Sequence, residues 1–166
     1  MTDDPIATPI ERYIAIDAHK HYVMVGGLNA RQDTVLPVRR VGMENYPEWA
    51  KANLRFGDAV VIEATTNTWT LSDVTLPQVS KVVVAHPVEV KQIACARVKT
   101  DNRDTLILVR LLAANLVPMV WVPPKHVREL RQFISHRRLA QMHTQVVSRI
   151  HSVCTRIIIS CSRKCP

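Results

Sequence analysis

Four acidic residues occupy positions that suit divalent-metal chemistry. Asp17 follows the apolar run Tyr-Ile-Ala-Ile, and Glu63 follows the apolar run Ala-Val-Val-Ile. A carboxylate at the end of a buried strand is costly unless a positive group compensates it. Asp101 and Asp104 stand three positions apart, so on a helix they share one face, where two like charges repel. Together the four predict a carboxylate site for Mg²⁺, and a two-ion site can cut or join a phosphodiester.

Taken alone, the pair Asp101 and Asp104 has a second interpretation. An acidic first turn interacts favourably with the helix dipole, and acidic residues are common where helices begin. Asp17 and Glu63 shift the balance, because each follows four apolar residues of an expected buried strand and therefore requires a partner. The prediction depends on the convergence of all four carboxylates.

The first half of the chain predicts three antiparallel strands followed by alternating strands and helices. Turn-forming glycine, asparagine and aspartate separate the first three apolar runs, as in a meander, and Pro37 places the third run at a sheet edge. Two continuous apolar runs then indicate buried parallel strands joined by helices. The predicted strands are 13–17, 22–27, 34–41, 59–63 and 81–85, and the predicted helices are 45–54, 69–79 with a break at Pro77, and one from Pro87.

This order of elements is that of an α/β, ribonuclease-H-like mixed sheet with flanking helices. In such a sheet the strands that end in Asp17 and Glu63 are neighbours, and a helix from Asp101 to about Asn115 places its acidic start near them. The predicted metal site therefore depends on the predicted fold.

The positive charge of the chain is concentrated in its last third. Residues 1–118 hold thirteen Lys/Arg and thirteen Asp/Glu, whereas 119–166 hold nine Lys/Arg and the single acid Glu129. A basic helical segment of this kind is typical of a polyanion-binding surface, although a solvated helix face is the alternative. The candidate nucleic-acid-binding residues are Lys99, Arg103, Arg128, Arg131, Arg137, Arg138 and Arg149.

The predicted domains are a catalytic unit over 1–118, a basic helical extension over 119–154 and an irregular tail over 155–166. A broken apolar stripe from Lys125 predicts a long helix, as in half of a coiled coil or helical hairpin. The tail is β-favouring at Ile157-Ile158-Ile159, and a frameshifted or truncated end would account for it. The ligand-type set His151, Cys154, Cys161 and Cys165 matches no common zinc spacing.

Several motifs resemble one family in the same order. They are IDAHK (16–20), VIEAT (61–65), HPVEVKQIACARVKTDNRDT (86–105) and WVPP (121–124) followed by LRQF. This set resembles the DEDD-type insertion-sequence transposases of the IS-one-ten group, whose amino-terminal domain is similar to the RuvC Holliday-junction resolvase. The resemblance covers roughly residues 12–153, and the Lys-Thr-Asp block is its most specific part.

The resemblance implies that Asp17, Glu63, Asp101 and Asp104 bind Mg²⁺ and assist DNA strand cleavage and joining during transposition. It also implies a structured guide RNA as a partner and a homo-oligomer when the protein is full length. Nothing after Val153 resembles the family's serine-bearing second domain, so we expect this chain not to transpose alone. The alternatives are a catalytically inactive nucleic-acid-binding fragment and a RuvC-like structure-specific nuclease.

Other function classes find little support in the sequence. No window is apolar enough to span a bilayer, and the acidic amino terminus lacks the apolar segment of a signal peptide, so we expect a cytoplasmic, nucleoid-associated protein without a membrane partner. Only four glycines are present and none follows Gly57, which argues against a P-loop, a dinucleotide fingerprint or an actin-like ATPase.

Overall fold

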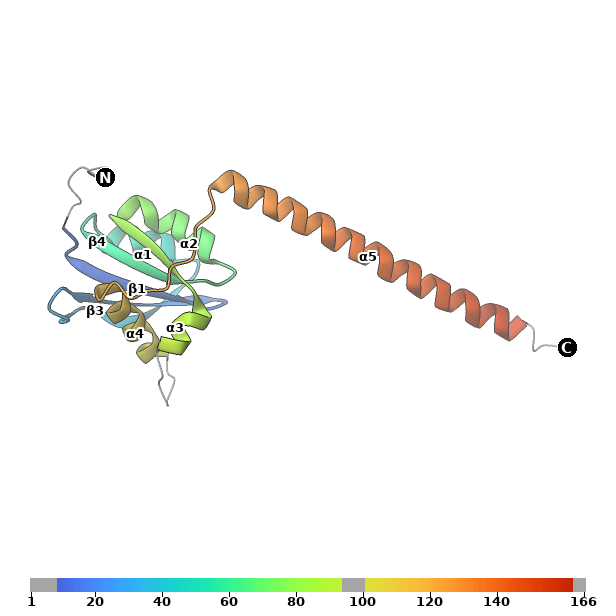
Figure 1. Ribbon diagram of the computed structural model, residues 1–166, viewed down its shortest axis with the longest axis horizontal. Helices are drawn as coiled ribbons and strands as arrows, with labels where there is room; N and C mark the ends of the chain where they lie inside the picture. Colours follow the sequence, from blue (N-terminus) through green and yellow to red (C-terminus); the bar gives the residue numbers. More distant parts are fainter. Residues whose placement is uncertain (1–8, 94–100, 163–166) are drawn as a thin grey trace. The chain divides into compact units, whose positions relative to one another are not determined.

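The first compact unit is an α/β domain built on a five-stranded mixed sheet. The computed structural model describes residues 9–93 and 101–162, with side chains as far as residue 157. The chain divides into two units, Met1–Trp121 and Val122–Pro166. The first contains the sheet and its flanking helices, and the second contains one long helix (Figure 1).

The sheet has the strand order β3-β2-β1-β4-β5. β1, β2 and β3 pair in antiparallel fashion, while β1, β4 and β5 pair in parallel. The predicted meander followed by parallel strands is therefore confirmed, with the Pro37-containing strand at one edge. The bounds are β1 Arg12–Ala18, β2 Tyr22–Asn29, β3 Thr34–Gly42, β4 Asp58–Glu63 and β5 Lys81–Ala85.

The helices follow the predicted order, with one change of type. The second helix ends at Thr75 and continues as a 3₁₀ turn that contains Pro77, because proline cannot supply the N–H that an α-helix needs there. The bounds are α1 Tyr46–Asn53, α2 Thr68–Thr75, η1 Leu76–Gln78, α3 Pro87–Ile93, α4 Asp101–Ala113 and α5 Lys125–Ser162.

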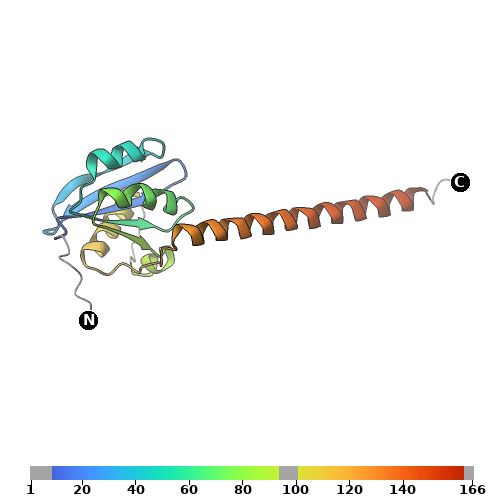
Figure 2. The same ribbon diagram turned by 90° about the horizontal axis from the view of Figure 1, so that it is seen from above.

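Strand alternation divides the core into two clusters, one on each face of the sheet. Ile14 and Ile16 of β1 pack with residues of α1 and α2, whereas Ala15 packs with residues of α4. Figures 1 and 2 show α1 and α2 on one side of the sheet and α4 on the other. Since side chains alternate along a strand, Asp17 follows Ala15 onto the α4 face. Glu63 reaches the same face by the same rule, because Val61 packs in the α4 cluster.

Gly26 sets how closely α4 approaches the sheet. A Cβ at this position would lie 2.8 Å from Val38 Cγ2 and 3.2 Å from Thr105 Cγ2, the latter on α4. We expect Gly26→Ala to lower the free energy of unfolding by about 1–3 kcal/mol, the usual cost of overpacking. Urea denaturation measures the change. Gly42→Ala is the matched control, because its Cβ would meet only side-chain atoms at 3.4 Å or more, and an equal loss in both variants would contradict the packing argument.

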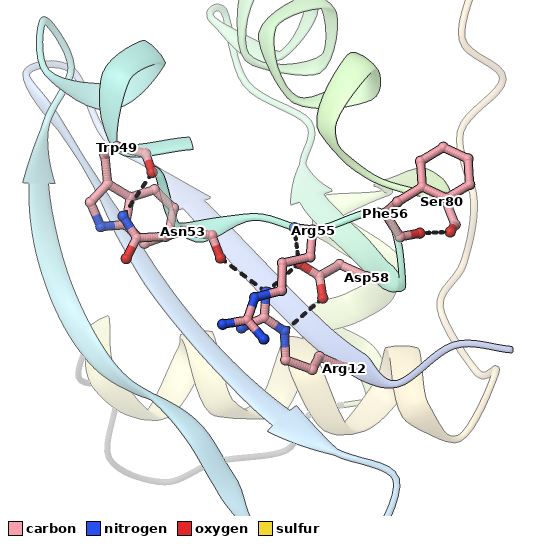
Figure 3. A network of polar contacts seen from close by, with 7 residues as sticks. All are labelled: Arg12, Trp49, Asn53, Arg55, Phe56, Asp58 and Ser80. Atoms are coloured by element: carbon pink, nitrogen blue, oxygen red, sulfur yellow. Dashed lines mark hydrogen bonds and ion pairs between the residues drawn. The ribbon is translucent and has the colours of Figure 1, made fainter. Parts of the chain in front are cut away.

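A buried ion pair joins β1 to β4 at the end of the sheet where both strands begin. Arg12 donates through Nε to Asp58 Oδ1 at 2.7 Å and through Nη2 to Asp58 Oδ2 at 2.6 Å (Figure 3). Arg12 Nη2 also donates to the Asn53 carbonyl, and the Arg55 amide donates to Asp58. Ser80 donates to the Phe56 carbonyl in the same region. Asp58, with a side chain only 1% exposed, is thus compensated by one guanidinium and one amide.

The long helix of the second unit extends further than the sequence predicted. α5 runs to Ser162, although residues 155–166 were expected to be an irregular tail. The described part of this tail contains neither glycine nor proline, so no strong helix breaker lies before Pro166. Most of the apolar side chains described on α5 are exposed, among them Phe133, Met142 and Ile150. No helix among the described residues is long and apolar enough to cross a membrane.

Candidate carboxylate metal centre

Two neighbouring strands and one helix carry the four predicted acids. Asp17 lies near the end of β1, and Glu63 is the last residue of the adjacent parallel strand β4. Asp101 and Asp104 lie in the first turn of α4, which covers the sheet face to which Asp17 and Glu63 point. Parallel neighbours end at the same edge of a sheet, so β1 and β4 present their carboxylates side by side.

Local hydrogen bonds fix the chain where β1 and β4 end and where α4 begins. The turn after β1 is closed by the His19 amide, which donates to the Tyr22 carbonyl at 2.9 Å. After β4, the Thr68 hydroxyl donates to the Glu63 carbonyl at 3.1 Å and accepts from the Thr65 amide at 2.6 Å. On α4, the Thr105 hydroxyl donates to the Asp101 carbonyl. The backbone that carries three of the acids is therefore held by neighbouring polar groups.

The pKa values of Asp17 and Glu63 show that the carboxylates influence one another. Burial raises the pKa of Asp17 above its ordinary value, and Asp101 and Asp104 raise it further by repulsion. Burial likewise raises the pKa of Glu63, and repulsion from Asp17 and Asp104, together with a hydrogen bond shared with Asp17, adds to the effect. Acids from three separate elements therefore destabilise one another's charged forms, as expected for convergent carboxylates.

Two basic side chains partly offset this negative charge. His19 Nε2 lies 3.2 Å from Asp17 Oδ2 and 3.8 Å from Asp101 Oδ2, so one ring nitrogen faces two carboxylates. Its interaction with Asp17 counteracts part of the rise in the Asp17 pKa. Lys91 on α3 opposes the rise in the Glu63 pKa in the same way. The pKa values of Asp17 and Glu63 nevertheless remain raised, with burial as the largest cause.

The donor chemistry of this cluster suits a hard divalent cation. Its members offer carboxylate oxygens, which Mg²⁺ and Mn²⁺ prefer over softer donors, and an added cation would relieve the repulsion that raises the pKa values of Asp17 and Glu63. Among the described residues, no three His, Cys, Asp or Glu side chains are already grouped as metal ligands. Asp17, Glu63, Asp101 and Asp104 are the residues that would hold Mg²⁺.

The predicted nucleic-acid-binding residues lie in two separate parts of the chain. Arg103 is exposed in the first turn of α4, between Asp101 and Asp104, whereas Lys99 lies outside the described residues. Arg128 is half-buried on α5. The remaining four are exposed on the same helix: Arg131, Arg137, Arg138 and Arg149. α5 therefore presents a basic surface along much of its length.

Four residues around the acids were not among the predicted site residues: His19, Tyr22, Arg40 and Lys91. The Tyr22 hydroxyl donates to Asp101 Oδ2 at 3.2 Å. The His19 and Tyr22 rings are stacked with centroids 4.5 Å apart, and Arg40 Cζ lies 3.8 Å from the centroid of the Tyr22 ring. His19 is two positions from Asp17, which is the one signal in the sequence. Arg40 joins the site only through the pairing of β3 with β2.

Comparison with known proteins adds no relative from which a role could be transferred. The chain matches no protein-family model, and no characterised protein sequence matches it. The chemistry of the site must therefore be argued from its own residues.

Proposed function

We propose that the first unit is a divalent-metal-dependent nucleic-acid-processing domain with a ribonuclease-H-like fold. The observation that carries this proposal is the mutual influence of Asp17, Glu63, Asp101 and Asp104, which come from β1, β4 and α4. The sheet order, with three antiparallel strands followed by two parallel ones, is compatible with that fold. Carboxylates whose pKa values are raised by burial and by specific charged neighbours are candidates for a functional site.

More specifically, we propose that the chain is the RuvC-like, metal-binding part of a DEDD-type insertion-sequence transposase that cuts and joins DNA. The supporting features are the order of the motifs around Asp17, Glu63 and the Lys-Thr-Asp block, and the basic segment that follows them. The four acids of these motifs lie where β1 and β4 end and where α4 begins.

In this proposal each side chain has a defined task. Asp17 and Glu63, at the ends of adjacent strands, would hold the cation, and Asp101 and Asp104 at the start of α4 would complete its set of ligands. When bound, Mg²⁺ supplies Lewis-acid polarisation of the scissile phosphate and stabilises charge on its oxygens. His19 and Lys91 balance part of the negative charge around the carboxylates.

The exposed arginines of α5 provide the second part of the proposal, which is binding of DNA or of an element-encoded guide RNA. Arginine side chains bind phosphates through planar, charge-assisted hydrogen bonds. The segment 119–166 has nine Lys/Arg and one acid, so its affinity for nucleic acid should fall steeply with salt. The same basic surface also favours a second candidate function, a non-catalytic nucleic-acid-binding module.

Metal binding and DNA cleavage by one set of variants test the catalytic proposal. We expect calorimetric titration with Mn²⁺ or Mg²⁺ to detect binding to the wild-type chain and none to Glu63→Gln. Any metal-dependent cleavage of linear or branched DNA by the wild-type chain should be lost in Glu63→Gln as well. Glu48→Gln is the matched control, because Glu48 is exposed on α1, on the other face of the sheet. Metal binding unchanged in Glu63→Gln would refute the assignment, and nucleic-acid binding without metal binding would favour the non-catalytic module.

A further inference from the structure

Three side chains form a column beside the acid cluster: His19, Tyr22 and Arg40. His19 and Arg40 both lie against the ring of Tyr22, at 4.5 Å between ring centroids and at 3.8 Å from Arg40 Cζ to the ring centroid. Two groups at these distances cannot share one face of a phenol ring, so His19 and Arg40 lie on opposite faces. The ring is therefore covered on both sides, and a nucleobase cannot stack on it without displacing one of them.

Tyr22 links this column to the candidate metal ligands. Its hydroxyl donates to Asp101 Oδ2 at 3.2 Å. Partial loss of hydration, followed by the nearby Asp101 carboxylate, raises the pKa of the Tyr22 phenol. One side chain thus holds Arg40 through its ring and Asp101 through its hydroxyl.

Strand register places Arg40 on the same sheet face as Asp17. Arg40 pairs with Met24, and Met24 pairs with Asp17 on the other side of β2. Residues directly opposite each other in a sheet point to the same face. Two strand spacings separate Arg40 from Asp17, which is about 10 Å. Arg40 therefore lies on the face that carries the carboxylates, two strands away from Asp17.

We propose that Arg40 binds a backbone phosphate of the DNA strand that is processed at the acid cluster, and that Tyr22 positions both Arg40 and Asp101 for this task. The inference rests on the proposed function and identifies a substrate-binding residue for it.

The chemistry of this arrangement fits a phosphate better than a base. A DNA strand that crosses a cluster of carboxylates is repelled by them, so a cation close to its path lowers the cost of approach. The Arg40 guanidinium lies over the Tyr22 ring and is exposed, so a ligand in solution can reach its N–H donors. Planar N–H donors match the paired oxygens of a phosphate.

The adjacent arginine provides an internal control. Arg39 is exposed like Arg40 but pairs with Val25 and therefore points to the other face of the sheet. We expect Arg40→Gln to weaken binding of a labelled single-stranded DNA to the full chain and to lower the slope of log affinity against log salt by about 0.7, the value for one lost phosphate contact. Arg39→Gln should leave that slope unchanged. Equal slopes for the two variants would overturn the proposal, and a change seen only with an RNA strand would overturn the assignment of DNA.

A second pair of variants separates positioning from binding. Tyr22→Phe keeps the ring under Arg40 but removes the hydrogen bond to Asp101, so it should weaken Mn²⁺ binding while preserving the salt slope for DNA. Tyr22→Leu should change both the Mn²⁺ affinity and the salt slope. Arg40→Lys should have the salt slope of the wild type, unlike Arg40→Gln, although it lacks the guanidinium that lies over the ring. An unaltered Mn²⁺ affinity in Tyr22→Phe would overturn the positioning role. If Glu63→Gln lost Mn²⁺ binding while the Arg39 and Arg40 variants bound DNA equally, the role of Arg40 would be refuted and the metal site would stand. If Glu63→Gln kept Mn²⁺ binding while only the Arg40 variant lowered the salt slope, the metal site would be refuted and phosphate binding by Arg40 would stand.

Discussion

Asp17→Asn is expected to stabilise the metal-free protein at neutral pH and to abolish its stabilisation by Mg²⁺. Asp17 is largely buried, and its charged form is disfavoured by burial and by repulsion from Asp101 and Asp104. Asparagine has a similar shape without the charge, so the repulsion disappears together with a metal ligand. A substitution that raises stability and removes ligand binding is the behaviour of a functional residue held at a cost.

The sign of the pH dependence follows from the raised pKa values. Asp17 and Glu63 have higher pKa values in the folded protein than the ordinary 3.8 and 4.5. As the pH rises from these ordinary values through the folded pKa values, the folded state binds more protons than the unfolded state. The free energy of unfolding therefore falls through this window and stays lower above it. Asp17→Asn should flatten the fall, because only Glu63 then contributes.

Thermal and chemical denaturation between pH 4 and pH 8, with and without Mg²⁺, measures both effects. A ligand present at 100 times its dissociation constant stabilises a folded protein by about 2.7 kcal/mol. We expect a gain of this order in the wild type and in Glu48→Gln, and none in Asp17→Asn. If Mg²⁺ stabilised Asp17→Asn as much as the wild type, Asp17 would not be a ligand. If the metal-free variant were less stable than the wild type at pH 7, the argument from repulsion would be wrong.

The largest loss of stability is expected from Asp58→Ala. This substitution leaves the Arg12 guanidinium, with a side chain 17% exposed, without its carboxylate, and it removes the acceptor of the Arg55 amide (Figure 3). Removing one partner of a buried ion pair typically costs about 3–5 kcal/mol. Urea denaturation of the variant measures the loss, and a change below about 1 kcal/mol, typical of an exposed pair, would contradict this view of the contact.

Two further variants show whether the cost arises from the pair itself. In a double-mutant cycle, Arg12→Ala combined with Asp58→Ala should be less destabilised than the sum of the single variants, because no unpaired charge remains. The ion pair lies where β1 and β4 begin, whereas Asp17 and Glu63 lie where these strands end. Asp58→Ala should therefore retain the affinity of the wild type for Mn²⁺ at temperatures where it is folded. A selective loss of metal affinity would contradict this separation.

Much of the sheet was predictable because its signals are local. Continuous apolar runs, turn residues and Pro37 were sufficient to predict five strands, the antiparallel first three and the edge position of the third. The end of α5 was less predictable. Three consecutive isoleucines favour strands, but neither glycine nor proline interrupts residues 125–162, and the helix continues to Ser162.

The acids of the candidate site were identified because each stands directly after an apolar run or within one helical turn of another acid. The residues around them were not, because they meet through pairing between distant parts of the chain. Arg12 and Asp58 are 46 positions apart, and Tyr22 and Asp101 are 79 apart. No local period connects such residues, and only the register of the strands and the docking of α4 bring them into contact.

The sequence by itself therefore determined which acidic residues stand at the ends of buried strands. It also determined where the positive charge of the chain is concentrated and in which order the strands and helices follow. Tertiary structure decided which of these charges influence one another. Side-chain alternation directs Asp17 and Glu63 to the face that α4 covers, and the register of β2 and β3 adds Tyr22 and Arg40 to their surroundings. The physical reason is that electrostatic interactions depend on distance and burial, and both are defined only once the sheet has formed.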